Sequence, residues 1–293
     1  MAAFRLKMAT QLGEKTAIEL GYRKFPVDPM KIARDKGIMV QAKPPESKGV
    51  SGVLIFAHDQ VSIIYSTAYN NEGFENFSVA HELGHYFLPG HPEEILKGGG
   101  IHLSRANFTQ NTSIELEADH FASGLLMPST FTRDLLSKSQ IGIEGILTLA
   151  HEARCSCTAA AIRSAEYSTY PMAVIVSQSD EVSYAFLSDG FKKLGKLAFL
   201  RKGTPLPSSL TRDFNADFEN VLGAKRACGE TNLHDWFDGP KGVALDEEIL
   251  GLGSYGFTLT VLSSEQLPSD PGEEEDEDVK LEDSWTPKFA HGR

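Results

Sequence analysis

Residues 77–87, FSVAHELGHYF, constrain this chain more than any other stretch of its sequence. Two histidines and a glutamate interrupt a run that is otherwise apolar and that predicts a buried helix. Polar groups in an apolar core cost free energy unless hydrogen bonds or a bound ion satisfy them. His81 and His85 are four residues apart, so a helix projects both imidazoles from one face. Such a pair either binds one metal ion or consists of two hydrogen-bonded core histidines.

The residue between the histidines favours the metal. Glu82 follows the first histidine directly, where its carboxylate can take a proton from a water molecule at the same ion. Two imidazoles are too few for a catalytic zinc site, which usually has three protein ligands and one open position. The motif therefore predicts a third ligand elsewhere in the chain.

The segment IELEADHFASGLLM supplies the candidates for that third ligand. Glu115 and Asp119 are four residues apart and share one face of a helix. We predict that Glu115 completes the zinc ligands and that Asp119 accepts the free N–H of a ligating histidine. Glu117 should point about 200° away from Glu115 around the helix. The alternative is that both glutamates are solvated acids, favoured by the helix dipole in a first turn.

The other elements of the N-terminal half predict an α+β arrangement. Helices are expected over residues 3–20 and after the Asp28-Pro29 cap. SGVLIF and QVSIIYST alternate like the two strands of a hairpin ahead of the histidine helix. HPEEILKGGGIHLSRANFTQN is expected to be a long loop that borders the site, because long loops inside compact domains are often functional.

The segment LTLAHEARCSCTAAAIR has the spacing of a helix-turn-helix, which would suit a DNA-binding regulator. Two features weaken that interpretation. Arg154 occupies a turn position that usually takes glycine, and the second helix offers a DNA groove mainly alanines and one arginine, Arg163. Nearby glutamates add no attraction for phosphate. A helical packing module is therefore the favoured interpretation of this segment.

Sequence pattern and charge divide the rest of the chain into a second domain and an acidic tail. Alternating segments after Tyr170 predict a second α+β domain. The net charge of −12 comes mostly from residues 269–283, which carry nine acids and one lysine and are expected to be a disordered tail. We predict four parts: a zinc-peptidase-like domain (1–128), a helical segment (129–169), an α/β domain (170–265) and the acidic tail (266–293).

The histidine motif, followed by ELEADHFASGLLMP, resembles the ImmA/IrrE family of metallopeptidases. The resemblance covers roughly residues 17–127 and extends to PVDPMKIARDKGI and the hairpin. It implies a gluzincin-like zinc peptidase with His81, His85 and Glu115 as ligands of one Zn²⁺, Glu82 as the general base and Asp119 behind a histidine. Tyr65, Tyr86 and His102 are candidate donors to the oxyanion, and the strand QVSIIYST is a candidate edge for an extended substrate.

The same resemblance implies a biological role. The family acts by limited cleavage of a helix-turn-helix transcriptional repressor, which induces stress genes such as those of the radiation and DNA-damage response. A GAF-like C-terminal domain is then expected to sense a small-molecule signal. Three cysteines, an odd number, and the lack of a signal peptide or a long apolar run predict a cytoplasmic protein without a membrane segment. Direct nucleic-acid binding is not expected, because no basic block is present.

Overall fold

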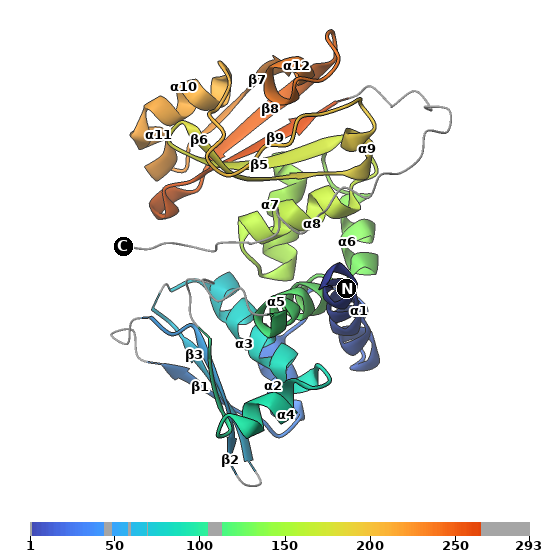
Figure 1. The fold of residues 1–293 in the computed structure, drawn as a ribbon, viewed down its shortest axis with the longest axis vertical. Helices are drawn as coiled ribbons and strands as arrows, with labels where there is room; N and C mark the ends of the chain where they lie inside the picture. Colours follow the sequence, from blue (N-terminus) through green and yellow to red (C-terminus); the bar gives the residue numbers. More distant parts are fainter. Residues whose placement is uncertain (1, 44–48, 58–59, 69, 105–112, 265–293) are drawn as a thin grey trace. The chain divides into compact units, whose positions relative to one another are not determined.

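Figure 1 shows the chain as a computed structural model, which describes residues 2–43, 49–57, 60–68, 70–104 and 113–264. The described chain forms two compact units. The N-terminal unit contains the residues up to Thr132 together with Leu149–Ala159, and the C-terminal unit contains Arg133–Thr148 and the residues from Ala160. Each unit combines helices with one β-sheet, which confirms the predicted α+β class. The three predicted boundaries between the four parts stay predictions.

The N-terminal unit is built on a four-stranded mixed sheet with the strand order β1-β3-β2-β4. β1 is parallel to β3, and the β2–β3 and β2–β4 pairs are antiparallel. Its elements up to residue 126 are α1 (Ala2–Glu19), α2 (Pro29–Asp35), β1 (Met39–Lys43), β2 (Gly52–Ala57), β3 (Gln60–Ser66), α3 (Glu72–Phe87), α4 (His91–Lys97), β4 (Ile101–Ser104) and α5 (Ser113–Leu126).

Local capping signals explain where two of these helices begin. Asp28 accepts a 2.8 Å hydrogen bond from the backbone N–H of Lys31, and Pro29 is the first residue of α2, as predicted. Asn71 caps α3 by accepting a 3.0 Å hydrogen bond from the backbone N–H of Phe74. The predicted helix around the two histidines is therefore confirmed.

Two predictions about this unit are wrong. QVSIIYST is not an edge, because β3 lies between β2 and a parallel partner, β1, that the hairpin pattern does not reveal. Residues 91–97 and 101–104 are not part of a loop, because they form α4 and β4. β4 is only four residues long, and it is a strand because it pairs with β2, which local patterning could not show. Residues 105–112 lie outside the described part of the chain.

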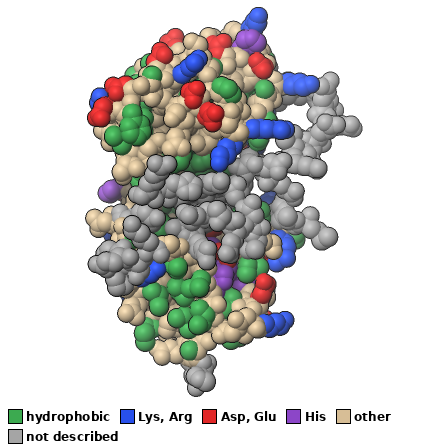
Figure 2. All heavy atoms as spheres, turned by 60° about the vertical axis from the view of Figure 1, so that its left-hand side comes forward, with side chains coloured by type: hydrophobic (Ala, Val, Ile, Leu, Met, Phe, Trp, Pro, Cys, Tyr) green, Lys and Arg blue, Asp and Glu red, His purple; other side chains and the backbone are tan. Residues whose placement is uncertain are grey.

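The pleat of the sheet decides which side chains face the helices. Leu54 of β2 lies opposite Ile63 of β3 and opposite His102 of β4, and both Leu54 and Ile63 are fully buried. Residues directly opposite each other on neighbouring strands point to the same face, so His102 belongs to the buried face. The alternate residues Ile101 and Leu103 are exposed on the opposite face. Figure 2 shows hydrophobic side chains on the face of this unit that is turned toward the viewer.

Three helices follow α5, namely α6 (Ser129–Leu136), α7 (Ile143–Ala153) and α8 (Cys157–Tyr167). Three residues join α7 to α8, and Arg154 adopts a positive φ of 50° among them. This is the turn position at which the sequence lacks the usual glycine. The helix-turn-helix spacing is thus present, although spacing alone does not make a DNA-binding surface. No described helix combines the length and apolar character needed to cross a membrane.

The C-terminal unit contains an antiparallel five-stranded sheet in the order β6-β5-β9-β8-β7. Its buried core joins Ile175 of the sheet to Phe191 and Phe237. The GAF-like assignment stays a prediction, and the acidic tail lies outside the described residues. Elements after residue 170 are β5 (Met172–Gln178), β6 (Glu181–Leu187), α9 (Asp189–Lys192), α10 (Leu210–Ala216), α11 (Phe218–Leu222), β7 (Arg226–Asn232), α12 (Leu233–Phe237), β8 (Ala244–Gly251), η1 (Gly253–Tyr255) and β9 (Thr258–Ser263).

Candidate metal centre

Helix α3 carries the histidine motif on its buried side. His81 is 3% exposed, and Glu82 and His85 are completely buried. Gly84 lets α3 approach α5 closely, because a Cβ atom at this position would lie only 3.0 Å from the Cα atom of Ala118. The close approach of the two helices brings the acidic side chains of α5 to the two histidines.

His81, His85 and Glu115 place their donor atoms in a compact triangle. The two Nε2 atoms are 3.1 Å apart, and each lies 3.4 Å from an oxygen of Glu115. Zinc bonds of about 2.0–2.1 Å at tetrahedral angles separate neighbouring donors by about 3.3–3.4 Å. The three predicted ligands therefore have the spacing that suits a single zinc ion.

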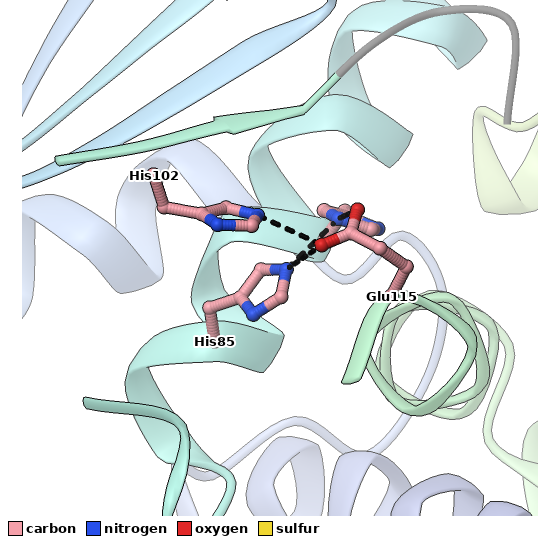
Figure 3. A group of neighbouring side chains, drawn as sticks. His85, His102 and Glu115 are labelled. Carbon is pink, nitrogen blue, oxygen red and sulfur yellow. Dashed lines mark hydrogen bonds and ion pairs between the residues drawn. The ribbon is translucent and has the colours of Figure 1, made fainter. Parts of the chain in front are cut away.

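His102 of β4 adds a fourth donor beside this triangle. Figure 3 shows His85, His102 and Glu115 pointing toward one another from α3, β4 and α5. Nε2 of His102 lies 2.9 Å from Oε1 of Glu115, yet it makes no hydrogen bond of good geometry within the described chain. The donor atoms of this residue and of the three predicted ligands all lie within 4.8 Å of one another. Buried nitrogen and oxygen atoms that converge in this way fit a cation at their centre.

Sequence reasoning placed His102 in a loop, as one of three candidate donors to an oxyanion. The only available signal was the alternation in IHLS, which becomes informative once β4 pairs with β2. The other two candidates differ in their surroundings. Tyr86 stacks on Phe56 with ring centroids 6.5 Å apart, and Tyr65 lies opposite Gly52 in the sheet. An oxyanion role for either tyrosine stays a prediction.

The carboxylate of Glu82 is held between β2 and β4. Oγ of Ser104 donates a 2.6 Å hydrogen bond to Oε1 of Glu82. Gly52 leaves room for this oxygen, because a Cβ atom on Gly52 would lie 2.4 Å from it. Oε2 has no hydrogen-bond partner among the described residues. One oxygen is therefore fixed, and the other is left for a water molecule or substrate.

Buried groups also contact the second nitrogen of each α3 histidine. Nδ1 of His81 lies 2.8 Å from Oδ1 of Asp119, the arrangement that the sequence predicts. Nδ1 of His85 lies 3.1 Å from Nδ1 of His91, a contact that the sequence did not predict. Such partners orient a ligating imidazole and select its tautomer.

The burial of Glu117 and its ion pair are the largest departures from the sequence-based expectation for this helix. It is only 5% exposed and Glu115 only 9%, so the alternative in which both are solvated acids is wrong. Glu117 points away from the metal donors, as helical geometry requires, but it forms a 3.0 Å ion pair with Arg5 of α1. The packing of α1 on α5 buries this position, which a helical pattern within α5 cannot show.

Burial and charge shift the titration of these groups in different directions. Burial raises the pKa of Glu82 and that of Asp119. Burial alone would lower the pKa of His81, but Asp119 and Glu115 outweigh it and raise this pKa well above its usual value. Burial lowers the pKa of His85 to about 3. Burial opposes ionisation of Glu115, yet the imidazoles of His102, His81 and His85 lower its pKa strongly. Glu115 is therefore an anion at neutral pH.

Comparisons with known proteins agree with this geometry. Residues 33–165 match the IrrE N-terminal-like domain of the M78 peptidase family. A solved Mycobacterium tuberculosis transcriptional regulator is similar in fold, with a TM-score of 0.54 and 15% identity over 87% of this chain and 76% of that one. No curated protein matches the chain. The matched region contains α3, β4 and α5, and therefore all four donors of the candidate centre. Residues 33–165 thus form an IrrE N-terminal-like domain of the M78 peptidase family.

Proposed function

We propose that this protein is a zinc-dependent, site-specific protease that cleaves a helix-turn-helix transcriptional repressor and thereby induces a radiation and DNA-damage response. The observation that carries the peptidase part is the convergence of His81, His85 and Glu115 beside the half-satisfied carboxylate of Glu82. The donor set of nitrogen and oxygen atoms suits zinc. The repressor as substrate rests on the family resemblance alone.

The residues around the centre can divide the chemistry among them. When bound, zinc would polarise the scissile carbonyl and favour deprotonation of the attacking water. Glu82 uses Oε2 to take that proton, while Ser104 keeps its other oxygen in place. The same carboxyl group can then deliver the proton to the leaving amine. The raised pKa of buried Glu82 suits a group that must both take and return a proton.

An extended substrate can pair with β4. This strand is at one edge of the sheet, and β2 is its neighbour within the sheet. It carries His102 and Ser104 on the face of the metal centre. A peptide added as a further strand would run past these side chains. β4 therefore replaces β3 as the proposed substrate edge.

His102→Ala should separate a transition-state role from a ligand role. We assign His81, His85 and Glu115 as the residues that would hold the metal, which leaves an N–H of His102 as a donor to the oxyanion. The variant should retain one zinc ion per chain and should cleave about 100- to 1000-fold more slowly. Metal analysis and a cleavage assay on the same sample test this. Loss of zinc from the variant would instead identify His102 as a fourth ligand.

The regulatory part of the proposal rests on the resemblance of the sequence to IrrE, the radiation-response regulator of Deinococcus, whose domain order we expect this chain to share. A GAF-like C-terminal domain would then receive the signal that licenses cleavage. The solved structure with a similar fold is described as a transcriptional regulator. That description fits a protein that controls transcription either by cutting a repressor or by binding DNA itself.

The DNA-binding alternative is weakened by one residue. Arg163 is the only basic residue of α8, and its side chain is 2% exposed. Its guanidinium donates a 2.7 Å hydrogen bond to Glu166 and another of 3.0 Å to the hydroxyl of Tyr167. The helix that would enter a DNA groove therefore offers no free cation along its described length.

Duplex DNA should accordingly bind weakly. At about 0.15 M salt we expect a dissociation constant of about 1 µM or weaker, because non-specific affinity comes from basic surface. Fluorescence anisotropy with random and operator-like duplexes measures it. Nanomolar, sequence-specific binding by this chain alone would favour the regulator without peptidase activity.

The central test combines metal content with cleavage. The purified protein should contain one zinc ion per chain, and a candidate helix-turn-helix repressor incubated with it should be cut at one bond. Chelation should stop cleavage, and added zinc should restore it. Intact repressors after incubation with the zinc-loaded protein would remove the substrate assignment, whereas absence of bound zinc would remove the peptidase assignment.

A further inference from the structure

A second buried polar chain lies behind His85, outside the groups used in the proposed chemistry. Nδ1 of His85 lies 3.1 Å from Nδ1 of His91, whose Nε2 lies 3.5 Å from Oε2 of Glu117. The same carboxylate oxygen accepts a 3.0 Å hydrogen bond from Nη2 of Arg5. His91 and Glu117 are 1% and 5% exposed. The contacts thus lead from a candidate metal ligand through the protein interior to a residue at the surface.

Local structure explains how His91 reaches this place. It is the first residue of α4 and follows Gly90, whose φ of 91° reverses the chain after α3. The backbone N–H of His91 donates a 3.2 Å hydrogen bond to the carbonyl of Leu88, which closes the turn. The imidazole is thereby folded back toward the last turn of α3, where His85 lies.

The requirement of a metal ligand fixes the protons along this chain. If Nε2 of His85 presents a lone pair to a metal, its Nδ1 must carry the proton of the neutral ring. That N–H can donate only to an unprotonated Nδ1 of His91, which places the proton of His91 on Nε2. This second N–H faces the carboxylate of Glu117, which can only accept. One set of tautomers therefore satisfies both contacts.

The arrangement differs from the one at His81, which meets the carboxylate of Asp119 directly. A carboxylate at the same place behind His85 would join Glu82, Glu115 and Asp119 as a fourth buried anion around one site. Buried charges are costly unless they are paired. A neutral imidazole accepts the proton of His85 without adding charge, and the anion that orients it stands one residue further away, paired with Arg5.

We propose that His91, supported by Glu117 and Arg5, is a positioning residue that holds the imidazole of His85 in the orientation and tautomer required for metal binding. This inference rests on the proposed metal-binding role of His81, His85 and Glu115. It adds His91 of α4 and Arg5 of α1 to the side chains of α3, α5 and β4 that form the site.

The test is the zinc dissociation constant, measured by competition with a chromophoric chelator on the full-length chain. His91→Leu removes the acceptor of His85 and should weaken zinc binding about 10- to 100-fold. His91→Asn restores an oxygen that can accept from Nδ1 of His85 and should recover most of the lost affinity. A role limited to core packing would not produce this rescue, because asparagine fills the site less well than leucine.

Glu117→Ala provides a second variant in case His91→Leu does not fold. It leaves His91 in place but removes the acceptor that selects its tautomer, and it should weaken zinc binding within the same range. Thr10→Ala is the matched control, since Thr10 also joins α1 to α5, through a 3.0 Å contact with His120. This control should bind zinc as tightly as the unmodified chain.

The outcomes separate this inference from the proposed function. If the unmodified chain binds zinc and a folded His91→Leu or Glu117→Ala variant binds it equally tightly, the positioning role is overturned while the peptidase assignment stands. Equal weakening by Thr10→Ala would also overturn it, since loosened helix packing would then explain the loss. If the unmodified chain binds no zinc, the proposed function fails first.

Discussion

Glu82→Gln should abolish peptide cleavage while the protein keeps its fold and its zinc. The amide can still accept the hydrogen bond of Ser104 through one oxygen, and it has nearly the same volume in the space left by Gly52. The amide nitrogen at the second position cannot take a proton from water. Removing a general base typically costs 100- to 10,000-fold in rate, so we expect a loss of at least about 100-fold.

Three measurements decide the Glu82→Gln result. Bound zinc and the thermal unfolding temperature should match those of the unmodified protein, and the cleavage rate should be lost. Glu75→Gln is a suitable control, because it makes the same change on the same helix two turns earlier, outside the group of converging donors. Cleavage at the normal rate by Glu82→Gln would contradict the assigned mechanism, and Glu82 would then have only a structural role.

The part of the site that lies within single helices could be predicted from the sequence. Residues four apart on one helix share a face whatever the rest of the fold does, so the pairs His81 and His85, and Glu115 and Asp119, are readable locally. The prediction that Asp119 contacts a ligating histidine follows from the same geometry once α3 and α5 meet face to face, and in the structure that histidine is His81. The metal-binding roles of these residues stay predictions until metal is measured.

The residues that sequence reasoning missed depend on contacts between distant segments. His102 reaches the centre only because the four residues of β4 pair with β2. The hydrophobic alternation of IHLS is too short to predict a strand by itself. Glu117 is buried by α1, and His91 reaches His85 through a turn. The prediction that β3 is an edge strand is wrong for a related reason, because its parallel partner, β1, lies before the hairpin in the sequence.

In the C-terminal unit, too, some strands cannot be recognised from the local sequence pattern. Its strands β5 and β6 lie among the alternating segments after Tyr170, whereas β7 and β8 do not show a clear alternation. RACGETN and ALDEEILG carry polar residues at many positions, including Glu247, which is fully buried and accepts hydrogen bonds from the backbone N–H and hydroxyl of Thr211. A buried acid that caps a helix interrupts the apolar pattern by which strands are recognised.

Glu115→Ala should strip zinc from the protein or weaken its binding more than any change outside the ligand set. The carboxylate lies 3.4 Å from Nε2 of both His81 and His85, and it stays ionised despite its burial. Its removal takes away both a donor and the negative charge that balances the cation. The loss of affinity should exceed about 100-fold, the upper end of the effect expected for residues behind a ligand.

A graded series of variants tests this ranking. Glu115→Ala should lose the most zinc affinity, Asp119→Ala and Glu117→Ala should each lose about 10- to 100-fold, and the exposed Glu93→Ala should lose none. The chelator competition that tests His91 measures all four on one scale. Because Glu117 contacts His91, its replacement should cost more zinc affinity than the replacement of a solvated surface acid. If Glu115→Ala retained zinc while Glu117→Ala released it, α5 would present the opposite face to the histidines, and Glu117 would be the ligand.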